Sequence, residues 1–288
     1  MASVDGLAFR ALWSRLEPSA GVYNWSSLDE IADVARASGK RLTVHIAPDL
    51  PTWLPVLGAQ TYSFNSPLIG SGTAVVPWDP VFLGRHGAFT SALADHLRVR
   101  GDATLLDVVS VGAPVAEMSL PACQNGVLGT TITYDRSQYL AAWRTSFTAH
   151  QNAFANSAFA QVQLVVSAPV SQICRPDNDG AAFYSEVMTH ALATSPRAGV
   201  FLADLNALGS NRLLQVDSTT RAQARLHFQT IWSFSDDPTN RFQGPLRDAV
   251  CFGWRAGARY YELYKADLTS SDAAVVSAVA TARTGAGC

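Results

Sequence analysis

The stretch that decides the fold runs over residues 7–47 and reads LAFRALWSRLEPSAGVYNWSSLDEIADVARASGKRLTVHIA. Its two ends, residues 7–13 and 41–47, are short apolar runs that predict two strands. Between them, apolar residues recur over positions 28–35 with the spacing of an amphipathic helix, and Gly39 ends that pattern. A strand, a helix and a second strand in this order predict a parallel βαβ unit.

The same alternation continues to the end of the chain. Further strands are predicted at 105–111, 162–168, 200–204, 225–232 and 259–264. Helices are predicted at 89–99, 137–156, 180–194, 245–256 and 271–283. Seven strands with about as many helices, and no linker-like change in composition, predict an α/β chain with one catalytic domain over residues 1–288. The closest architecture is a (β/α)8 TIM barrel in which one strand is missing or irregular.

Two other features bear on this fold prediction. A doubly wound open sheet is the alternative architecture, but residues 13–18, which follow the first strand, lack the glycine-rich phosphate turn of that fold. Residues 49–83 form a long segment rich in Pro, Gly and aromatic residues. A loop of this length inside a compact domain is usually functional.

Charged residues are scarce, at 15% of the 288 residues against 48% hydrophobic, and the formal charge is −2. Because there is no run of Lys or Arg and no apolar run of about 18 residues, neither nucleic acid nor a membrane is expected as a partner. The chain has only two Lys and five Glu and is rich in Ser, Thr, Ala, Asn and Gln. This composition is typical of secreted enzymes, and we expect an extracellular monomer.

The four cysteines are Cys123, Cys174, Cys251 and Cys288, and none forms a CxxC pair. Since the histidines also lack metal-ligand spacing, we expect no metal and no cofactor. Cys123 and Cys174 follow the exits of consecutive strands, and Cys251 and Cys288 belong to the last two helical units. Disulfides Cys123–Cys174 and Cys251–Cys288 are therefore predicted, with free buried thiols as the alternative.

The active site of a barrel lies at the carboxyl ends of its strands. In this chain those positions are rich in aromatic rings, amides and carboxylates, which stack on sugar rings and bind hydroxyl groups. The pattern predicts a carbohydrate site without a cofactor. The side chains expected to bind the substrate are Arg10, Trp13, His45, Trp53, Trp78, Gln229, Trp232 and Tyr264.

Glycoside hydrolysis needs two carboxyl groups, one protonated and one ionised. Of the five glutamates, Glu30 and Glu186 lie in predicted helices, and Glu17, before a Pro, is expected to be structural. Glu117 and Glu262 remain, both at strand exits in apolar sequence that would raise a carboxyl pKa. The alternatives are a helix cap or Arg partner for Glu117, and a buried Arg partner or a binding role for Glu262. Asp79 and Asp204 are reserve carboxylates.

Residues 12–29, LWSRLEPSAGVYNWSSLD, resemble the W-x-x-x-E-P-x-x-G-x-Y-x-W-x-x-L-D segment of the retaining (β/α)8-barrel glycoside hydrolases, a superfamily that includes xylanases, cellulases and β-galactosidases. Residues 51–54 (PTWL) and 78–80 (WDP) are similar to that group too, and the likeness is best over the first 120 residues. The resemblance implies that Glu117 is the acid/base and Glu262 the nucleophile.

The chain departs from the family pattern at two places. Ala116 stands where the family has Asn before its acid/base, and if the first strand corresponds to the family's second, Glu262 falls on strand eight and Gln229 near the nucleophile position. Three functions follow: a glycosidase cleaving O-glycosidic bonds of a poly- or oligosaccharide, a non-catalytic carbohydrate-binding barrel, and an unrelated barrel lyase or isomerase. The glycosidase is the expectation; a carboxyl separation above ~6.5 Å would indicate inversion.

Overall fold

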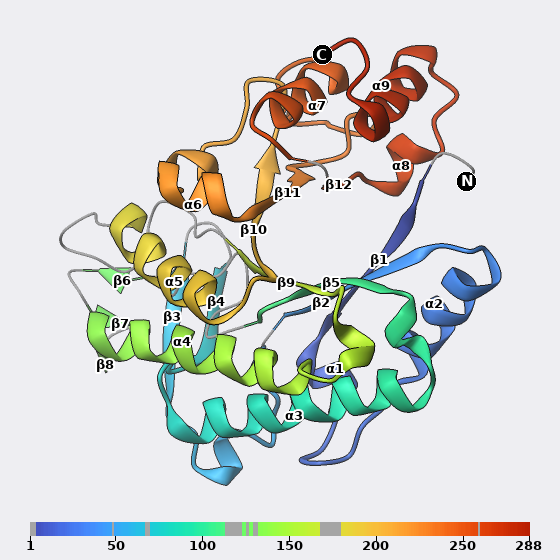
Figure 1. Ribbon diagram of the computed structural model, residues 1–288. Coiled ribbons are helices and arrows are strands. Elements are labelled where there is room, and N and C mark those ends of the chain that lie inside the picture. Colours follow the sequence, from blue (N-terminus) through green and yellow to red (C-terminus); the bar gives the residue numbers. More distant parts are fainter. Residues whose placement is uncertain are drawn as a thin grey trace.

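The computed structural model describes residues 4–47, 49–66, 70–112, 123–124, 127–128, 132–167, 180–258 and 260–288 (Figure 1). Its main sheet has seven strands among these residues, and every neighbouring pair is parallel. In sheet order, which is also chain order, they are β1 (Gly6–Leu12), β2 (Arg41–Ala47), β5 (Leu106–Ser110), β9 (Gln163–Ser167), β10 (Ala198–Leu205), β11 (Arg225–Thr230) and β12 (Tyr260–Glu262). All seven strands expected from the sequence are present, and the parallel barrel-type fold is confirmed.

The sheet is curled, so that its last strand lies near its first two. Five strand spacings separate β2 from β12 in the sheet order, which is about 24 Å in a flat sheet with ~4.8 Å between strands. Yet the hydroxyl oxygens of Thr43 on β2 and Tyr260 on β12 are 2.5 Å apart. Among the described residues no backbone pairing joins β12 to β1, and side chains bridge this seam instead.

Helices follow most of the strands and cover the outer face of the sheet (Figure 1). The longer ones are α2 (Ser26–Ala37), α3 (Pro80–Val99), α4 (Arg136–Ala153), α5 (Gly180–Thr194), α7 (Leu246–Arg255) and α9 (Ala273–Thr284). Shorter ones are α1 (Trp13–Leu16), α6 (Ser218–Gln223) and α8 (Lys265–Leu268), with single 3-10 turns at Pro55–Leu57, Asp102–Thr104, Ser157–Phe159 and Arg212–Gln215. None of the described helices combines the length and the apolar character needed to span a membrane.

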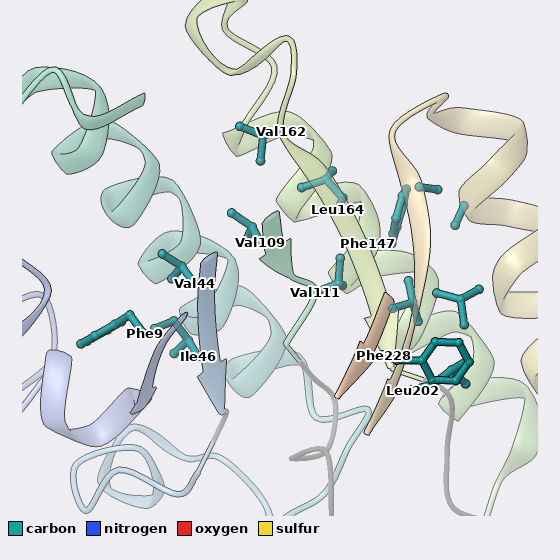
Figure 2. Packing of buried hydrophobic residues seen from close by; sticks show 14 of the residues in the cluster. Phe9, Val44, Ile46, Val109, Val111, Phe147, Val162, Leu164, Leu202 and Phe228 are labelled. Carbon is teal, nitrogen blue, oxygen red and sulfur yellow. The ribbon is translucent and has the colours of Figure 1, made fainter. Parts of the chain in front are cut away.

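Alternation along the strands separates two cores. Outward-facing side chains pack against the helices, and Figure 2 shows Phe9, Val44, Leu164 and Phe228 in this layer together with Phe147 of α4. The inward-facing residues form a small separate cluster. Its buried members are Val108, Val165 and Phe201, with Ala203 and Tyr260 packed against them. The inner layer therefore leaves many positions to polar side chains, and these build the site described below.

The segment 49–83 is more regular than its composition indicated. It contains an antiparallel hairpin of β3 (Thr61–Ser66) and β4 (Gly70–Val75), and α3 begins at Pro80 rather than at residue 89. Asp79 caps α3 by accepting a hydrogen bond from the Phe82 amide, at 2.8 Å. A small three-stranded sheet of β6 (Cys123–Gln124), β7 (Val127–Leu128) and β8 (Ile132–Thr133) was not predicted either.

The two ends of the described chain meet. Arg283 on α9 forms an ion pair with Asp5, just before β1, and β1 begins near α8 in Figure 1. A disulfide joins Cys251 of α7 to Cys288, which confirms one of the two predicted pairings. The other pairing needs Cys174, which lies outside the described residues.

Candidate active site at the barrel seam

Side chains at the carboxyl ends of the first and last strands meet at the seam of the curled sheet. Arg10 and His45 occupy paired positions on β1 and β2, and Gln229 and Glu262 occupy paired positions on β11 and β12. Tyr264 follows Glu262 by two residues, at the start of α8. The inner-face alternation of all four strands turns these side chains toward one another, at the end of the barrel where active sites form.

Glu262 is the centre of this cluster. Its carboxylate accepts hydrogen bonds from Arg10 Nη2 at 2.7 Å and from His45 Nε2 at 2.5 Å. The side chain of Glu262 is 8% exposed and that of Arg10 is 36% exposed. Burial alone would raise the pKa of Glu262, but the charges and hydrogen bonds of His45 and Arg10 outweigh it and lower that pKa to about 2. Glu262 is therefore ionised over the whole working range of an enzyme.

A chain of buried hydroxyl groups lies beneath the carboxylate. The Tyr260 hydroxyl is 3.0 Å from Glu262 Oε1 and 2.5 Å from Thr43 Oγ1. Burial, and next the charge of Glu262, raise the pKa of Tyr260 well above its ordinary value, so the phenol keeps its proton. Since an ionised carboxylate only accepts, Tyr260 donates to Glu262 and then accepts from Thr43.

The outer side of the cluster carries amide and aromatic groups. Arg10 Nη2 also donates to Gln229 Oε1 at 2.9 Å, and Gln229 Nε2 lies 3.5 Å from the Tyr264 hydroxyl. The ring of Tyr264 is 6.2 Å from that of Trp232, an exposed indole that follows β11. The guanidinium of Arg241 lies 4.8 Å from the centre of the Trp232 ring. Aromatic and amide groups therefore extend outward from the buried carboxylate.

Comparison with solved structures places this geometry in a known fold. The catalytic domain of a β-amylase from Paenibacillus polymyxa aligns over 97% of this chain and 90% of its own, with a TM-score of 0.67 and 11% identity. A β-galactosidase from the psychrophilic Marinomonas ef1 aligns over 96% of this chain and 54% of its own, with a TM-score of 0.55 and 12% identity. The chain has the fold of the barrel glycoside hydrolases. No protein-family model and no curated sequence matches it.

The sequence predicted a second carboxyl group for the site. Glu117, the expected acid/base, lies outside the described residues, which resume after residue 112 at Cys123. The other carboxylates considered from the sequence are engaged in structural contacts. Asp204 accepts hydrogen bonds from Ser210 Oγ and the Arg212 amide and closes the loop after β10. Asp79 caps α3, as described above.

Trp13, which was expected to bind substrate, has a completely buried ring. The strand ends one residue earlier than predicted, and Trp13 starts the single turn α1, which directs the indole into the core beside Phe82 and Phe89. Its Nε1 donates to Glu17 Oε2 at 2.7 Å. Glu17 is itself fully buried and also accepts from Arg85, as a structural residue would.

Trp53 and Trp78, also expected to bind substrate, are half-buried and contact other aromatic side chains. Trp53 packs edge-on against Trp13 at 5.5 Å and donates from Nε1 to the Glu17 carbonyl. Trp78 contacts Tyr134 and Tyr139 with ring centres 6.2 and 6.4 Å away. Both rings therefore take part in packing.

Sequence reasoning missed two members of the cluster, Thr43 and Tyr260. Each lies two residues before a predicted site residue on the same strand, so a period of two would have placed them on the same inner face. His227 on β11 lies beside this cluster. It is 3% exposed and packs 4.8 Å from the Tyr260 ring. Among the residues that the structure describes, no group of three or more His, Cys, Asp or Glu side chains could hold a metal ion.

Proposed function

We propose that the chain is a glycoside hydrolase that cleaves O-glycosidic bonds of a poly- or oligosaccharide, with residues 1–288 as one catalytic domain. The observation that supports this function best is the state of Glu262. It is an ionised carboxylate at the carboxyl end of a barrel strand, held by Arg10 and His45. The glycoside hydrolase fold of the chain agrees with this chemistry, for which two carboxyl groups suffice.

Each carboxyl group has a distinct role in the proposal. Glu262, whose pKa is lowered by His45 and Arg10, is suited to attack the anomeric carbon or to take a proton from an attacking water. It is unsuited to be the proton donor, since its pKa lies far below neutrality. Glu117 is assigned as the general acid that protonates the leaving oxygen. Carboxyl groups ~5–5.5 Å apart would retain the anomeric configuration, and ~6.5–9.5 Å would invert it.

The substrate is proposed to bind on the outer side of the cluster. Gln229 and Arg10 offer hydrogen-bonding groups beside the carboxylate, and Tyr264 and Trp232 offer ring faces next to them. Aromatic faces with nearby amides are suited to sugar rings, whose C–H faces are apolar and whose edges carry hydroxyls. His45 is assigned to holding Glu262 rather than to direct contact, because it is 5% exposed.

Three glutamate variants test the function directly. Glu262→Gln and Glu117→Gln are expected to lower kcat at least ~1,000-fold on whichever substrate of a polysaccharide and oligosaccharide panel the wild type cleaves. Glu30→Gln on the exposed surface of α2 is the matched control and should keep full activity. Undiminished sugar release by either site variant would remove that residue from the mechanism.

A second candidate function is carbohydrate binding without cleavage. One observation favours it: both Glu262 oxygens already accept hydrogen bonds, from Arg10 on one side and from His45 and Tyr260 on the other. Isothermal titration calorimetry with the same panel, followed by chromatography of the incubated sugars, separates the two functions. Binding with no released product would establish the binding protein, whereas any released product establishes the hydrolase.

Extracellular location is part of the proposal. The Cys251–Cys288 disulfide supports it, because disulfides persist in oxidising compartments. Thiol titration of the denatured protein, purified from its native source without reductant, should find no free thiol at residues 251 and 288. Finding both thiols reduced would contradict export. A monomer is proposed, which light scattering would check.

A further inference from the structure

The two oxygens of the Glu262 carboxylate have different environments. Oε1 accepts from His45 Nε2 at 2.5 Å and from the Tyr260 hydroxyl at 3.0 Å; His45 is buried, and the half-buried Tyr260 packs against the inner cluster of the barrel. Oε2 accepts from Arg10 Nη2 at 2.7 Å, and the Arg10 side chain is the exposed one of the three. Oε1 therefore points into the barrel and Oε2 toward its mouth.

Tyr260 has one hydroxyl proton, and its direction is settled by its two neighbours. The carboxylate of Glu262 can only accept, so the proton points to Oε1. The Thr43 hydroxyl, 2.5 Å away on β2, then donates to the phenol oxygen. Thr43 thus keeps the Tyr260 hydroxyl pointing at Glu262, across the seam between the last strand and the first two.

We propose that Tyr260, oriented by Thr43, is a positioning residue that holds Oε1 of Glu262 inside the barrel and presents Oε2 to the substrate. The inference rests on the proposed function, in which Glu262 is the reacting carboxylate. It assigns Oε2 as the reacting oxygen. It also assigns Tyr260 and Thr43 to fixing the position of that oxygen.

A packing role alone does not explain the tyrosine. A phenylalanine would fill the same space against His227, whereas a buried hydroxyl is unfavourable unless it is paired. Two donors on one oxygen also fix the rotation of the carboxylate, which one donor leaves free. The other charged or titratable groups that face Glu262 are Arg10 on β1, His45 on β2 and His227 on β11.

The test uses four variants of the full chain: Tyr260→Phe, Thr43→Val, Thr43→Ser and, as control, Tyr62→Phe. Tyr62 is a buried tyrosine, and within the described part of the chain its hydroxyl has no hydrogen-bonding partner. Tyr260→Phe should lower kcat about 10-fold or more with little change in KM, because a lost positioning contact acts on the reacting geometry. Thr43→Val should lower kcat to a smaller extent. Thr43→Ser, which keeps the hydroxyl, should retain the wild-type kcat.

A second readout reports the carboxylate itself. The chain has five glutamates, so protein labelled with 13C at the glutamate carboxyls gives five resonances, and that of Glu262 is identified by its loss in Glu262→Gln. Removing a hydrogen bond to the ionised form should raise the pKa of Glu262 by about one pH unit in Tyr260→Phe. The acid limb of the pH–rate profile should move by the same amount. Tyr62→Phe should change neither.

The outcomes separate this inference from the proposed function. If the wild type cleaves no glycoside, the proposed function fails, and the carbon titration still decides whether Tyr260 holds Glu262. If Tyr260→Phe leaves kcat and the Glu262 titration at their wild-type values, the positioning role is overturned. Equal losses of kcat in Thr43→Ser and Thr43→Val would also overturn it, because Ser keeps the hydroxyl that donates to Tyr260 and Val does not. The double variant Tyr260→Phe/Thr43→Val should be no worse than Tyr260→Phe alone.

Discussion

His45 and Glu262 lie 2.5 Å apart although five strand spacings separate β2 from β12 in the sheet order. Only a curled sheet allows this contact. The same contact then closes the curl, because no backbone pairing joins β12 to β1 in the described part of the chain. The candidate site is therefore also a structural joint, and substitutions in it are expected to affect stability as well as activity.

The Arg10–Glu262 ion pair should contribute measurably to stability. Replacing Arg10 with Met leaves a carboxylate that is 8% exposed with one cation fewer. Because Arg10 itself is partly exposed, we expect a loss of about 1–3 kcal/mol in the free energy of unfolding, less than for a fully buried pair. Urea denaturation at pH 7 measures it.

The matched control for that prediction is Arg98→Met. Arg98 pairs with Asp95 on the surface of α3, with both side chains well exposed, so its loss should change stability by less than ~0.5 kcal/mol. If Arg10→Met and Arg98→Met lower the free energy of unfolding equally, the Arg10–Glu262 pair contributes no more to stability than a surface ion pair.

Local sequence patterns were sufficient for the main sheet and insufficient for two other parts. All seven strands were predicted because buried parallel strands are continuous apolar runs. The β3–β4 hairpin was missed, although Tyr62 and Phe64 alternate with polar residues in β3, because the partner strand Gly70–Val75 is rich in Gly and Ser and has weak strand character. Trp13 was misplaced because one residue at a strand end decides whether a side chain faces the mouth or the core.

Several members of the candidate site were predictable from the sequence, but Thr43, Tyr260 and the contacts among the members were not. Arg10, His45, Gln229 and Glu262 follow from reading the strand ends, since parallel strands bring these ends to one edge. Which of them touch depends on the curl of the sheet, and the curl depends on packing across all seven strands. For the same reason, sequence patterns did not predict that the pKa of Glu262 is lowered. Its apolar neighbours predicted the opposite shift, and the two side chains that reverse it, Arg10 and His45, come from β1 and β2.

Acid should destabilise the fold through two buried histidines between α3 and α4. Burial lowers the pKa of His86 to about 3 and that of His150 to about 4, and their rings are 5.7 Å apart. In the unfolded chain both bind a proton below about pH 6.5. The unfolded state therefore binds more protons between pH 6.5 and 3, and stability is expected to fall through that window by a few kcal/mol in total.

Thermal unfolding at pH 7 and pH 4.5 measures this acid dependence, with His86→Leu as the diagnostic variant. The variant should lose less stability than the wild type between the two pH values, because one of the two groups no longer titrates. An unchanged difference between pH 7 and pH 4.5 would assign the acid sensitivity to other groups.

The exposed indole of Trp232 should contribute to substrate binding rather than to the fold. Trp232→Ala is expected to raise KM about 10-fold, because the ring contributes binding area next to Tyr264. Stability should change by less than ~1 kcal/mol, since the side chain lies on the surface. Steady-state kinetics on the cleaved substrate, with unfolding curves of the same samples, separates the two effects. An unchanged KM in Trp232→Ala would show that the substrate binds elsewhere at the barrel mouth.

The Cys251–Cys288 disulfide should stabilise the last helical unit. It closes a loop with a sequence separation of 37 residues, for which chain entropy predicts about 4 kcal/mol, and measured values are often lower. The double variant Cys251→Ala/Cys288→Ala should therefore lose about 2–4 kcal/mol in urea denaturation. Activity of the folded fraction should be kept, because α7 lies on the outer face of the sheet. A stability equal to that of the wild type would show that the C-terminal end is held by other contacts, such as Arg247 with Gly287.

Two helical glycines should respond in opposite ways to the same substitution. A Cβ at Gly253 of α7 would lie 2.7 Å from the Tyr261 hydroxyl and ring edge, whereas a Cβ at Gly84 of α3 would meet nothing within 4 Å. Ala is the better helix former by about 0.5–1 kcal/mol, so Gly84→Ala should stabilise by that amount. At Gly253 the overlap should exceed this gain and destabilise by about 1–3 kcal/mol, because Tyr261 on β12 is fixed by its hydrogen bond to the Val250 carbonyl. Because Tyr261 adjoins Glu262, displacement of β12 should also lower kcat in Gly253→Ala. Gly84→Ala should keep the wild-type kcat. Unfolding curves and steady-state kinetics on both variants measure these effects.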